Sequence, residues 1–172
     1  MLVAFRGRCK FRVYIPKKPR KYGIKIMALD DAKTHYLLNG YIYSGKDSDG
    51  KTLSEAENNF RKPTQSVLHL SRPINHTHRN ITADNWFSSI ELSMELQNRG
   101  LTYVGTLRKN QRDIPIEFLP SRKKEEMSAN YEFTNDLTLV AFVPKKNNAV
   151  LLVSSMHHTK STDPVSKKPE II

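Results

Sequence analysis

Asp84 is the residue whose type and position best suit chemistry. It ends a short β-prone segment, residues 80–84, is followed by Asn85, and precedes a predicted helix. Sites in open α/β sheets lie at the carboxyl ends of strands, where a carboxylate can coordinate Mg²⁺ or Mn²⁺ through its oxygens. The alternative is a structural role, because an Asp just before a helix commonly accepts hydrogen bonds from backbone N–H groups. Two-metal phosphoryl chemistry needs several acids, so Asp84 alone favours the structural role.

Four other acids are less well placed for a site with Asp84. Asp30 and Asp31 fall in a predicted hairpin turn, where Asp is common, and this turn lies at the wrong end of the strands. Asp47 and Asp49 belong to a Gly- and Ser-containing loop that lacks the distal Glu of a calcium loop. We therefore expect turn and loop roles for these side chains.

The histidines and the cysteine do not form a recognisable site. His76 and His78, and likewise His157 and His158, have no Cys or acidic partner at the spacing of a metal site. We expect all four to be surface residues. Cys9 has no nearby His, which argues against a catalytic nucleophile.

The positive charge of the chain is concentrated at its start. The formal net charge is +11, and the first 29 residues contain nine basic side chains and no acidic one. Such a cluster, interleaved with aromatic residues, could neutralise phosphates while the rings stack on bases. A solvated basic face or a nuclear-import patch is an equal alternative. The DNA-binding candidates are Arg6, Arg8, Lys10, Arg12, Lys17, Lys18, Arg20 and Lys21.

Length and composition exclude several classes of protein. A chain of 172 residues with 38% hydrophobic residues can bury a sizeable core. The single cysteine excludes a small secreted domain held by disulfides. No apolar run approaches the roughly 20 residues that span a bilayer, so no membrane partner is expected.

The first half of the chain predicts a hairpin followed by helices. Residues 24–28 alternate in hydrophobicity and residues 36–43 are rich in aromatic and branched side chains, which is typical of paired strands. Ser54 and Glu57 have the spacing of a capping box. A longer helix is predicted over residues 65–74, with Thr64 as its N-cap.

An α/β unit is predicted around Asp84. Ser88 and Glu91 have capping-box spacing, which predicts a helix with Ser88 as its N-cap. Gly100 fits the left-handed residue that ends a helix, and residues 101–107 predict a strand directly after it. Strand, acid, helix and strand in this order indicate a sheet with Asp84 at its carboxyl edge.

A second β-rich region follows a charged connector. Residues 131–133, 137–143 and 149–154 are three strand-like segments separated by turn-forming residues, so an antiparallel meander is predicted. From His157 onward the chain is polar and contains proline.

Four segments of the chain resemble piggyBac-type transposases in the same order. Residues 5–23 are similar to the family's FRGRC…KP.KYG signature, and residues 81–89 to its DNWF(S/T)S segment. Residues 105–110 with Ile114 and Pro115 resemble its GT-R-N…IP segment, and residues 168–172 its KPxxI stretch. The resemblance extends over nearly all 172 residues.

The resemblance implies a metal-dependent DNA-cleaving core. Family members have a ribonuclease H-like fold and move elements at TTAA targets, using three aspartates and two divalent ions, Mg²⁺ or Mn²⁺. Only the second of these aspartates matches a residue here, and it is Asp84. The first is expected just before the FRGRC motif, where residues 1–4 contain no acid, and the third beyond Ile172. We therefore expect a fragment that does not cleave DNA alone.

The resemblance also predicts the organisation and role of the chain. The expected fold is α/β, a ribonuclease H-like mixed sheet with flanking helices, truncated at both ends. Residues 1–115 would be the partial core, 116–158 a β-rich insertion segment and 159–172 a polar tail. The expected partners are DNA and a full-length homologous transposase, in the nucleus. The alternative is a domesticated DNA-binding or protein-interaction module without nuclease activity.

Overall fold

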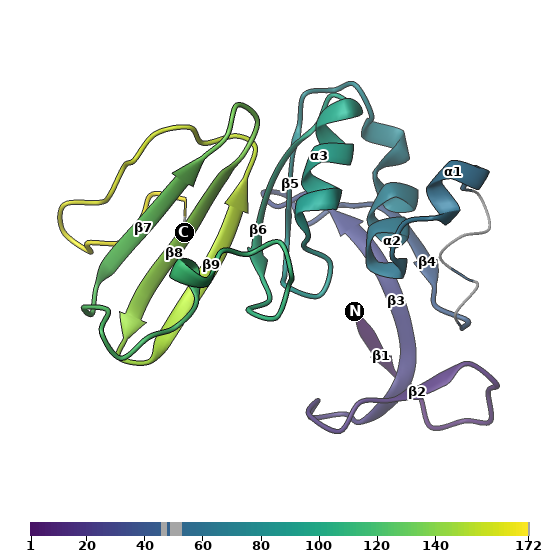
Figure 1. The fold of residues 1–172 in the computed structure, drawn as a ribbon. Helices are drawn as coiled ribbons and strands as arrows, with labels where there is room; N and C mark the ends of the chain where they lie inside the picture. The colour runs from purple at the N-terminus through teal and green to yellow at the C-terminus, as the bar shows by residue number, and fades with distance from the viewer. Residues whose placement is uncertain (46–47, 49–52, 172) are drawn as a thin grey trace. The chain divides into compact units, whose positions relative to one another are not determined.

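The computed structural model describes residues 1–45, 48 and 53–171. Asp47, Asp49 and the last residue of the expected tail, Ile172, lie outside the described residues. The chain divides into two compact units, Met1–Ile74 and Asn75–Ile172 (Figure 1). Each unit combines a sheet with helices, as expected for the α/β class.

The sheet of the first unit is built around one long strand. This strand, β3 (Tyr22–Asp30), pairs antiparallel with β1 (Leu2–Ala4), β2 (Arg12–Tyr14) and β4 (Leu37–Ile42). The predicted hairpin between β3 and β4 is confirmed. Asp31 lies in its turn, where Oδ1 accepts hydrogen bonds from the backbone N–H groups of Lys33 and Thr34, at 3.1 and 2.7 Å.

Helix α2 (Lys62–Ser71) covers one face of this hairpin. The Asn39 side chain donates to the Leu70 carbonyl at 2.9 Å, and the Tyr41 and Ser66 hydroxyls are 2.7 Å apart. The predicted limits of the helix were wrong, because it begins three residues earlier and Thr64 is a buried residue within it. Pro63 lies in the first turn, where its missing N–H costs nothing and its fixed φ favours the helix.

The short helix α1 (Glu55–Asn58) confirms the capping box at Ser54 and Glu57. The Glu57 carboxylate accepts from the Ser54 N–H at 2.6 Å and also pairs with Arg72 at 2.9 Å. Arg72 begins the 3₁₀ turn η1 (Arg72–Ile74). The carboxylate therefore joins the start of α1 to the end of α2.

The second unit contains a five-stranded sheet of order β5-β6-β9-β8-β7. Only the first pair is parallel, and the other neighbours are antiparallel. The strands are β5 (Asn80–Ala83), β6 (Thr102–Leu107), β7 (Ser128–Phe133), β8 (Thr138–Lys145) and β9 (Asn148–Ser154). The predicted meander is confirmed as β7-β8-β9.

The meander continues the sheet that contains β5 and β6, through the pairing of β9 with β6. Strands on both sides of residue 115 therefore share one sheet, and the 3₁₀ turn η2 (Ile116–Phe118) lies between them. The tail folds back along the meander, where the Tyr131 hydroxyl donates to the Ser161 carbonyl at 3.0 Å. The division into residues 1–115, 116–158 and 159–172 stays a prediction.

Helix α3 (Ile90–Asn98) connects β5 to β6 and begins one residue later than predicted. Its N-cap is Ser89, whose hydroxyl accepts from the Leu92 N–H at 3.0 Å, so the capping box at Ser88 and Glu91 was wrong. The predicted stop at Gly100 is confirmed. Its φ is +65°, and the N–H groups of Gly100 and Leu101 donate back into the last turn.

Ser88 is not the cap because its hydroxyl is used inside the unit. Ser88 Oγ lies 2.6 Å from the hydroxyl of Tyr103 on β6, and both residues are buried. Gly105, also on β6, leaves room for this pair. A Cβ at position 105 would lie 2.5 Å from Ser88 Oγ and 2.5 Å from the Tyr103 hydroxyl.

We expect Gly105→Ala to destabilise the second unit by about 1–3 kcal/mol, because the added methyl group overlaps two buried hydroxyls. Urea unfolding followed by circular dichroism measures the change. In a background that carries Ser88→Ala and Tyr103→Phe, which removes both hydroxyls, the same change should cost less. An equal cost in both backgrounds would contradict the packing described for Gly105.

The burial of Tyr103 also predicts that the free energy of unfolding depends on pH. Burial raises the pKa of Tyr103 from 10.0 to about 12, the Ser88 hydrogen bond opposes this rise, and the charge of Asp84 adds to it. The pKa of Tyr103 is higher in the folded than in the unfolded chain. The free energy of unfolding therefore keeps its full value below pH 10 and falls as the pH rises towards 12. The loss is about 1.4 kcal/mol per pH unit. Urea unfolding between pH 8 and 11 should show a steeper loss for the wild type than for Tyr103→Phe, and equal slopes would refute it.

Candidate active site

Asp84 lies directly after β5, in the turn that leads to α3, and its side chain is exposed. One carboxylate oxygen, Oδ1, accepts a hydrogen bond from the Trp86 N–H at 2.9 Å. The backbone carbonyl of Asp84 accepts from the Ser88 hydroxyl at 2.7 Å and from the Phe87 and Ser88 N–H groups at 3.2 Å. The structural role foreseen for Asp84 is therefore present.

This role uses only part of the carboxylate. Among the described residues, no hydrogen-bond donor contacts the second oxygen, Oδ2, and the side chain faces solvent. The turn orients the carboxyl group through one oxygen and leaves the other available. Such a carboxylate can bind a cation while its position is fixed by the backbone.

Two residues that sequence reasoning missed hold this turn in place. The hydroxyl of Tyr103 contacts Ser88 Oγ, and the side-chain N–H of Gln111 donates to the Ser88 carbonyl at 2.7 Å. The alternation of β6 predicts that Tyr103 is buried, but no signal in the sequence indicates the partner of its hydroxyl. Gln111 directly follows the segment 105–110 that resembles the family motif, and this proximity is the one available clue.

Basic side chains occupy the same edge of the sheet. Because β5 and β6 are parallel and Ala83 pairs with Gly105, the residues after both strands lie at one end. Arg108 Nε donates to the side-chain oxygen of Asn85 at 3.4 Å, and Lys109 donates to Asn148 at 3.0 Å. A carboxylate beside an exposed guanidinium suits a phosphodiester, which needs a metal-bound face and a cation for its charge.

The described residues do not by themselves make a two-metal site. Within residues 1–45, 48 and 53–171, no three His, Cys, Asp or Glu side chains gather closely enough to hold a metal ion. Asp84 and Asn85 offer oxygen donors of the right kind, but Mg²⁺ takes about six ligands and paired ions share several acids. Among the described residues, Asp84 and Asn85 are therefore candidates for part of a ligand set only.

The histidines expected at the surface divide into two groups. His76, His78 and His158 are exposed, as predicted. His157 is half-buried, and its Nδ1 lies 2.9 Å from Ser154 Oγ, so the prediction of a surface residue was wrong there. The Ser154 hydroxyl also accepts from the His157 N–H at 3.0 Å, so this histidine closes the turn after β9.

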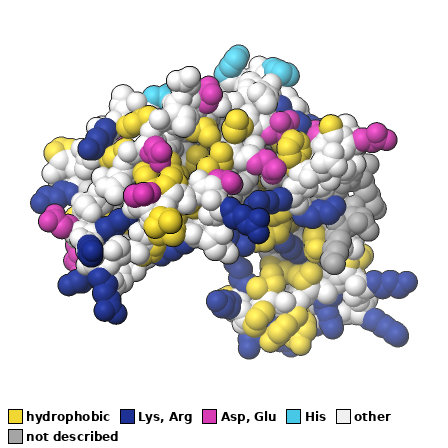
Figure 2. Space-filling model, in the orientation of Figure 1, with side chains coloured by type: hydrophobic (Ala, Val, Ile, Leu, Met, Phe, Trp, Pro, Cys, Tyr) yellow, Lys and Arg dark blue, Asp and Glu magenta, His cyan; other side chains and the backbone are white. Residues whose placement is uncertain are grey.

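The predicted DNA-binding residues lie on and around β1, β2 and the start of β3. All eight side chains are exposed. On the face shown in Figure 2, Lys and Arg side chains surround the lower part of the first unit, where no Asp or Glu is visible. The cluster is therefore an uncompensated positive surface.

Arg12 differs from the other basic residues of this surface. Its guanidinium donates to the carbonyl of Arg6 at 2.9 Å and to that of Gly7 at 3.1 Å, and it lies 5.1 Å from the centre of the Tyr22 ring. These contacts hold the loop between β1 and β2. Arg12 thus has a structural role that the sequence pattern did not indicate.

Two comparisons with known proteins agree with this geometry. Residues 1–171 match the family described as Transposase IS4. A solved structure, the cryo-EM structure of piggyBac transposase in a synaptic complex with hairpin DNA, is similar with a TM-score of 0.88 and 40% sequence identity. The likeness covers 99% of this chain and 35% of the solved chain, so this chain spans about a third of that protein's length.

From the sequence, no membrane partner is expected. In the part of the chain that is described, no helix has the length and hydrophobicity needed to cross a bilayer.

The expected α/β fold class and the family resemblance are both confirmed by these comparisons. The motif around Asp84 lies at the carboxyl end of β5, and the family match extends from the first residue to residue 171. With a shared fold at 40% identity over almost the whole chain, these observations have one explanation: the chain belongs to the piggyBac-type transposase family.

Proposed function

We propose that this chain is part of a transposase catalytic domain that binds DNA, with Asp84 as one carboxylate of a site for divalent metal ions, Mg²⁺ or Mn²⁺. DDE-type transposases in general use divalent metals. The observation that carries the proposal is the exposed Asp84 carboxylate at the carboxyl end of β5, which the turn orients through one oxygen. In a complete site, the metals would activate the nucleophile and stabilise the leaving oxygen in strand cleavage and transfer.

We also propose that this chain does not cleave DNA by itself. Asp84 supplies at most two of the roughly six oxygen ligands of one Mg²⁺ ion. Further carboxylates would have to come from a longer chain or from a partner, such as a full-length homologous transposase. The role of Asp84 would then be to complete a site that other segments share.

A nicking assay tests the catalytic part. We expect no cleavage of hairpin DNA or of TTAA-containing duplex by residues 1–172, with either Mg²⁺ or Mn²⁺, because one carboxylate cannot position two ions. The assay measures the conversion of labelled DNA on a denaturing gel. Metal-dependent cleavage that disappears in Asp84→Ala would overturn the inactive assignment. Asp136→Ala, a change of an exposed acid on the turn before β8, serves as the matched control.

A second candidate function is a DNA-binding or protein-interaction module without nuclease activity. The observation that favours it is the exposed basic surface of the first unit, which needs no metal site to bind phosphates. The first candidate and the DNA-binding form of the second both act on DNA, so we also propose the nucleus as the compartment in which the protein acts. The two candidates differ in whether DNA cleavage depends on Asp84 once the other residues of a catalytic site are supplied.

DNA binding itself has a direct test. We expect the affinity for duplex DNA to fall steeply with salt, because Lys and Arg release counterions from the phosphates. Changing four residues of the exposed basic surface of the first unit to Ala should weaken binding and reduce the salt slope by about 0.9 for each phosphate contact that is lost. Fluorescence anisotropy from 50 to 200 mM salt gives both values. The four residues are Arg6, Arg8, Lys17 and Lys18.

The control for this experiment removes the same charge elsewhere. Four exposed basic residues of the second unit are changed to Ala and should affect binding less: Arg122, Lys123, Lys145 and Lys167. Binding that is absent, or that does not depend on salt, would count against DNA as the partner.

A further inference from the structure

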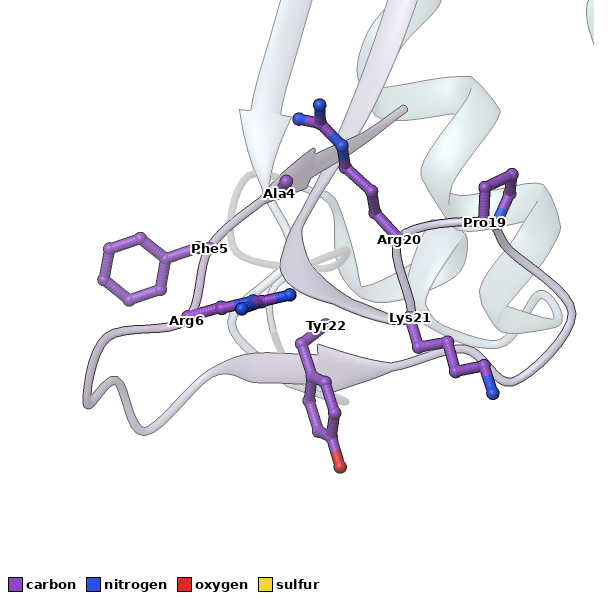
Figure 3. Close-up of a pocket in the computed structure, with 7 residues that line it drawn as sticks. All are labelled: Ala4, Phe5, Arg6, Pro19, Arg20, Lys21 and Tyr22. Carbon is purple, nitrogen blue, oxygen red and sulfur yellow. The ribbon is translucent and has the colours of Figure 1, made fainter.

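The loop between β2 and β3 combines closely spaced positive charges with an exposed backbone. We call residues 16–21 the basic loop, and it contains four basic residues: Lys17, Lys18, Arg20 and Lys21. Every residue of the loop is exposed. Figure 3 shows the side chains of Arg20 and Lys21 leaving the chain in opposite directions, as neighbouring residues of an extended segment do. The loop therefore presents a dense and accessible set of cations.

Backbone hydrogen bonds hold the basic loop mainly at its base. The Ile15 N–H donates to the Lys21 carbonyl at 2.8 Å, and the Lys18 N–H donates to the Ile15 carbonyl at 3.2 Å. The two prolines of the loop have no N–H, and each favours an extended conformation in the residue before it. A protein that binds residues 17–20 in an extended form would therefore disturb one backbone hydrogen bond of the described residues, the one that Lys18 donates.

The charges of the basic loop are not compensated within the described part of the chain. Its four basic side chains make no hydrogen bond or ion pair with the described residues, and no acidic residue occurs among the first 29. Other cations of the first unit are engaged, because Arg12 lies 5.1 Å from the centre of the Tyr22 ring and Lys25 lies 4.9 Å from that of Tyr43. Four like charges in one loop repel one another, and an acidic partner would relieve that repulsion.

The other runs of basic residues are shorter or lie beside acids. The run 122–124 is followed directly by two glutamates, and its Lys124 donates to the Glu117 carbonyl. Lys167 and Lys168 are a pair only, and Glu170 follows them closely. No other stretch of five residues in the sequence contains four basic residues. The density of charge therefore distinguishes the basic loop from the rest of the sequence.

We propose that the basic loop is a nuclear import signal, bound by a receptor protein that has an acidic groove. Runs of Lys and Arg of this length are typical of nuclear localisation signals. A groove that takes an extended segment binds consecutive side chains and needs a backbone that can be straightened, and the loop provides both. Duplex DNA needs neither, because its phosphates accept cations from any part of a surface. The proposal rests on the proposed function only in that it takes the nucleus as the compartment.

The test is the nuclear import of a large cargo. The full chain is fused to a tandem of fluorescent proteins that is too large to diffuse through nuclear pores, because a chain of 172 residues by itself could enter by diffusion. We expect the fusion to accumulate in the nucleus, and microscopy of living cells measures the ratio of nuclear to cytoplasmic fluorescence. Changing Lys17, Lys18 and Arg20 to Ala should abolish the accumulation. A loop variant that accumulates as strongly as the wild type would overturn the proposal.

Two matched variants remove the same charge elsewhere. In one, Arg6, Arg8 and Lys10, which belong to the same exposed basic surface, are changed to Ala. In the other, the three basic residues of the run 122–124 are changed to Ala. Both fusions should accumulate as strongly as the wild type. Equal loss in all three variants would assign the accumulation to total charge and would refute a role specific to the basic loop.

Permeabilised cells separate import by a receptor from retention by DNA. The purified fusion is added with and without cytosolic extract, which supplies soluble receptors, and we expect nuclear accumulation only with the extract. An excess of the unlabelled chain should reduce the accumulation because it occupies the receptors, whereas an excess of the unlabelled loop variant should not. Accumulation that needs no extract would point to retention by DNA and would contradict the receptor.

The proposal and the proposed nuclear compartment fail in different ways. If the wild-type fusion and the loop variant accumulate equally, the basic loop is excluded and the nucleus stands. If neither fusion accumulates, the loop is again excluded, and fractionation of cells that express the chain without cargo decides the compartment. DNA binding in vitro is measured independently of both. Circular dichroism of each variant establishes that the fold is retained.

Discussion

The hydrogen bond between Ser88 and Tyr103 is the interaction on which the candidate site depends. It joins the turn after β5 to the middle of β6, inside the second unit, where a lost partner would leave a buried hydroxyl unpaired. The Ser88 hydroxyl also contacts the Asp84 carbonyl, so one side chain connects the core to the exposed acid. These contacts fix the position of the turn that carries the exposed carboxylate. The proposed metal ligand would need such a fixed position.

The same constraint explains why β6 has a glycine at its centre. Two hydroxyls and the Tyr103 ring occupy the space above Gly105, and no side chain fits beside them. The start of α3 follows from this arrangement. Ser88 is committed to the core, and therefore the next residue, Ser89, caps the helix.

Much of the fold could be predicted because its signals are local. The β3–β4 hairpin, the stop at Gly100 and the meander each follow from turn residues and alternating hydrophobicity within a few positions. The errors arose where tertiary contacts decided between equivalent residues. Ser88 and Ser89 both suit an N-cap, and only the partner across the sheet selects one. Asp84 could be singled out through the motif around it, whereas the structural contacts of Gln111 and Arg12 could not, since no spacing rule relates these side chains to the carbonyl groups that accept their hydrogen bonds.

The order of strands in the second unit has a consequence for how a catalytic centre could be completed. In the described residues, β5 is at the end of its sheet, with β6 on one side only. The outer side of β5 therefore presents backbone groups that can pair with one more strand. A strand added there in parallel would end level with Asp84, and an acid at its last position would lie next to that carboxylate. Among the described strands, one side of β5 is thus left without a paired strand, beside the residue at its carboxyl end that carries the candidate carboxylate.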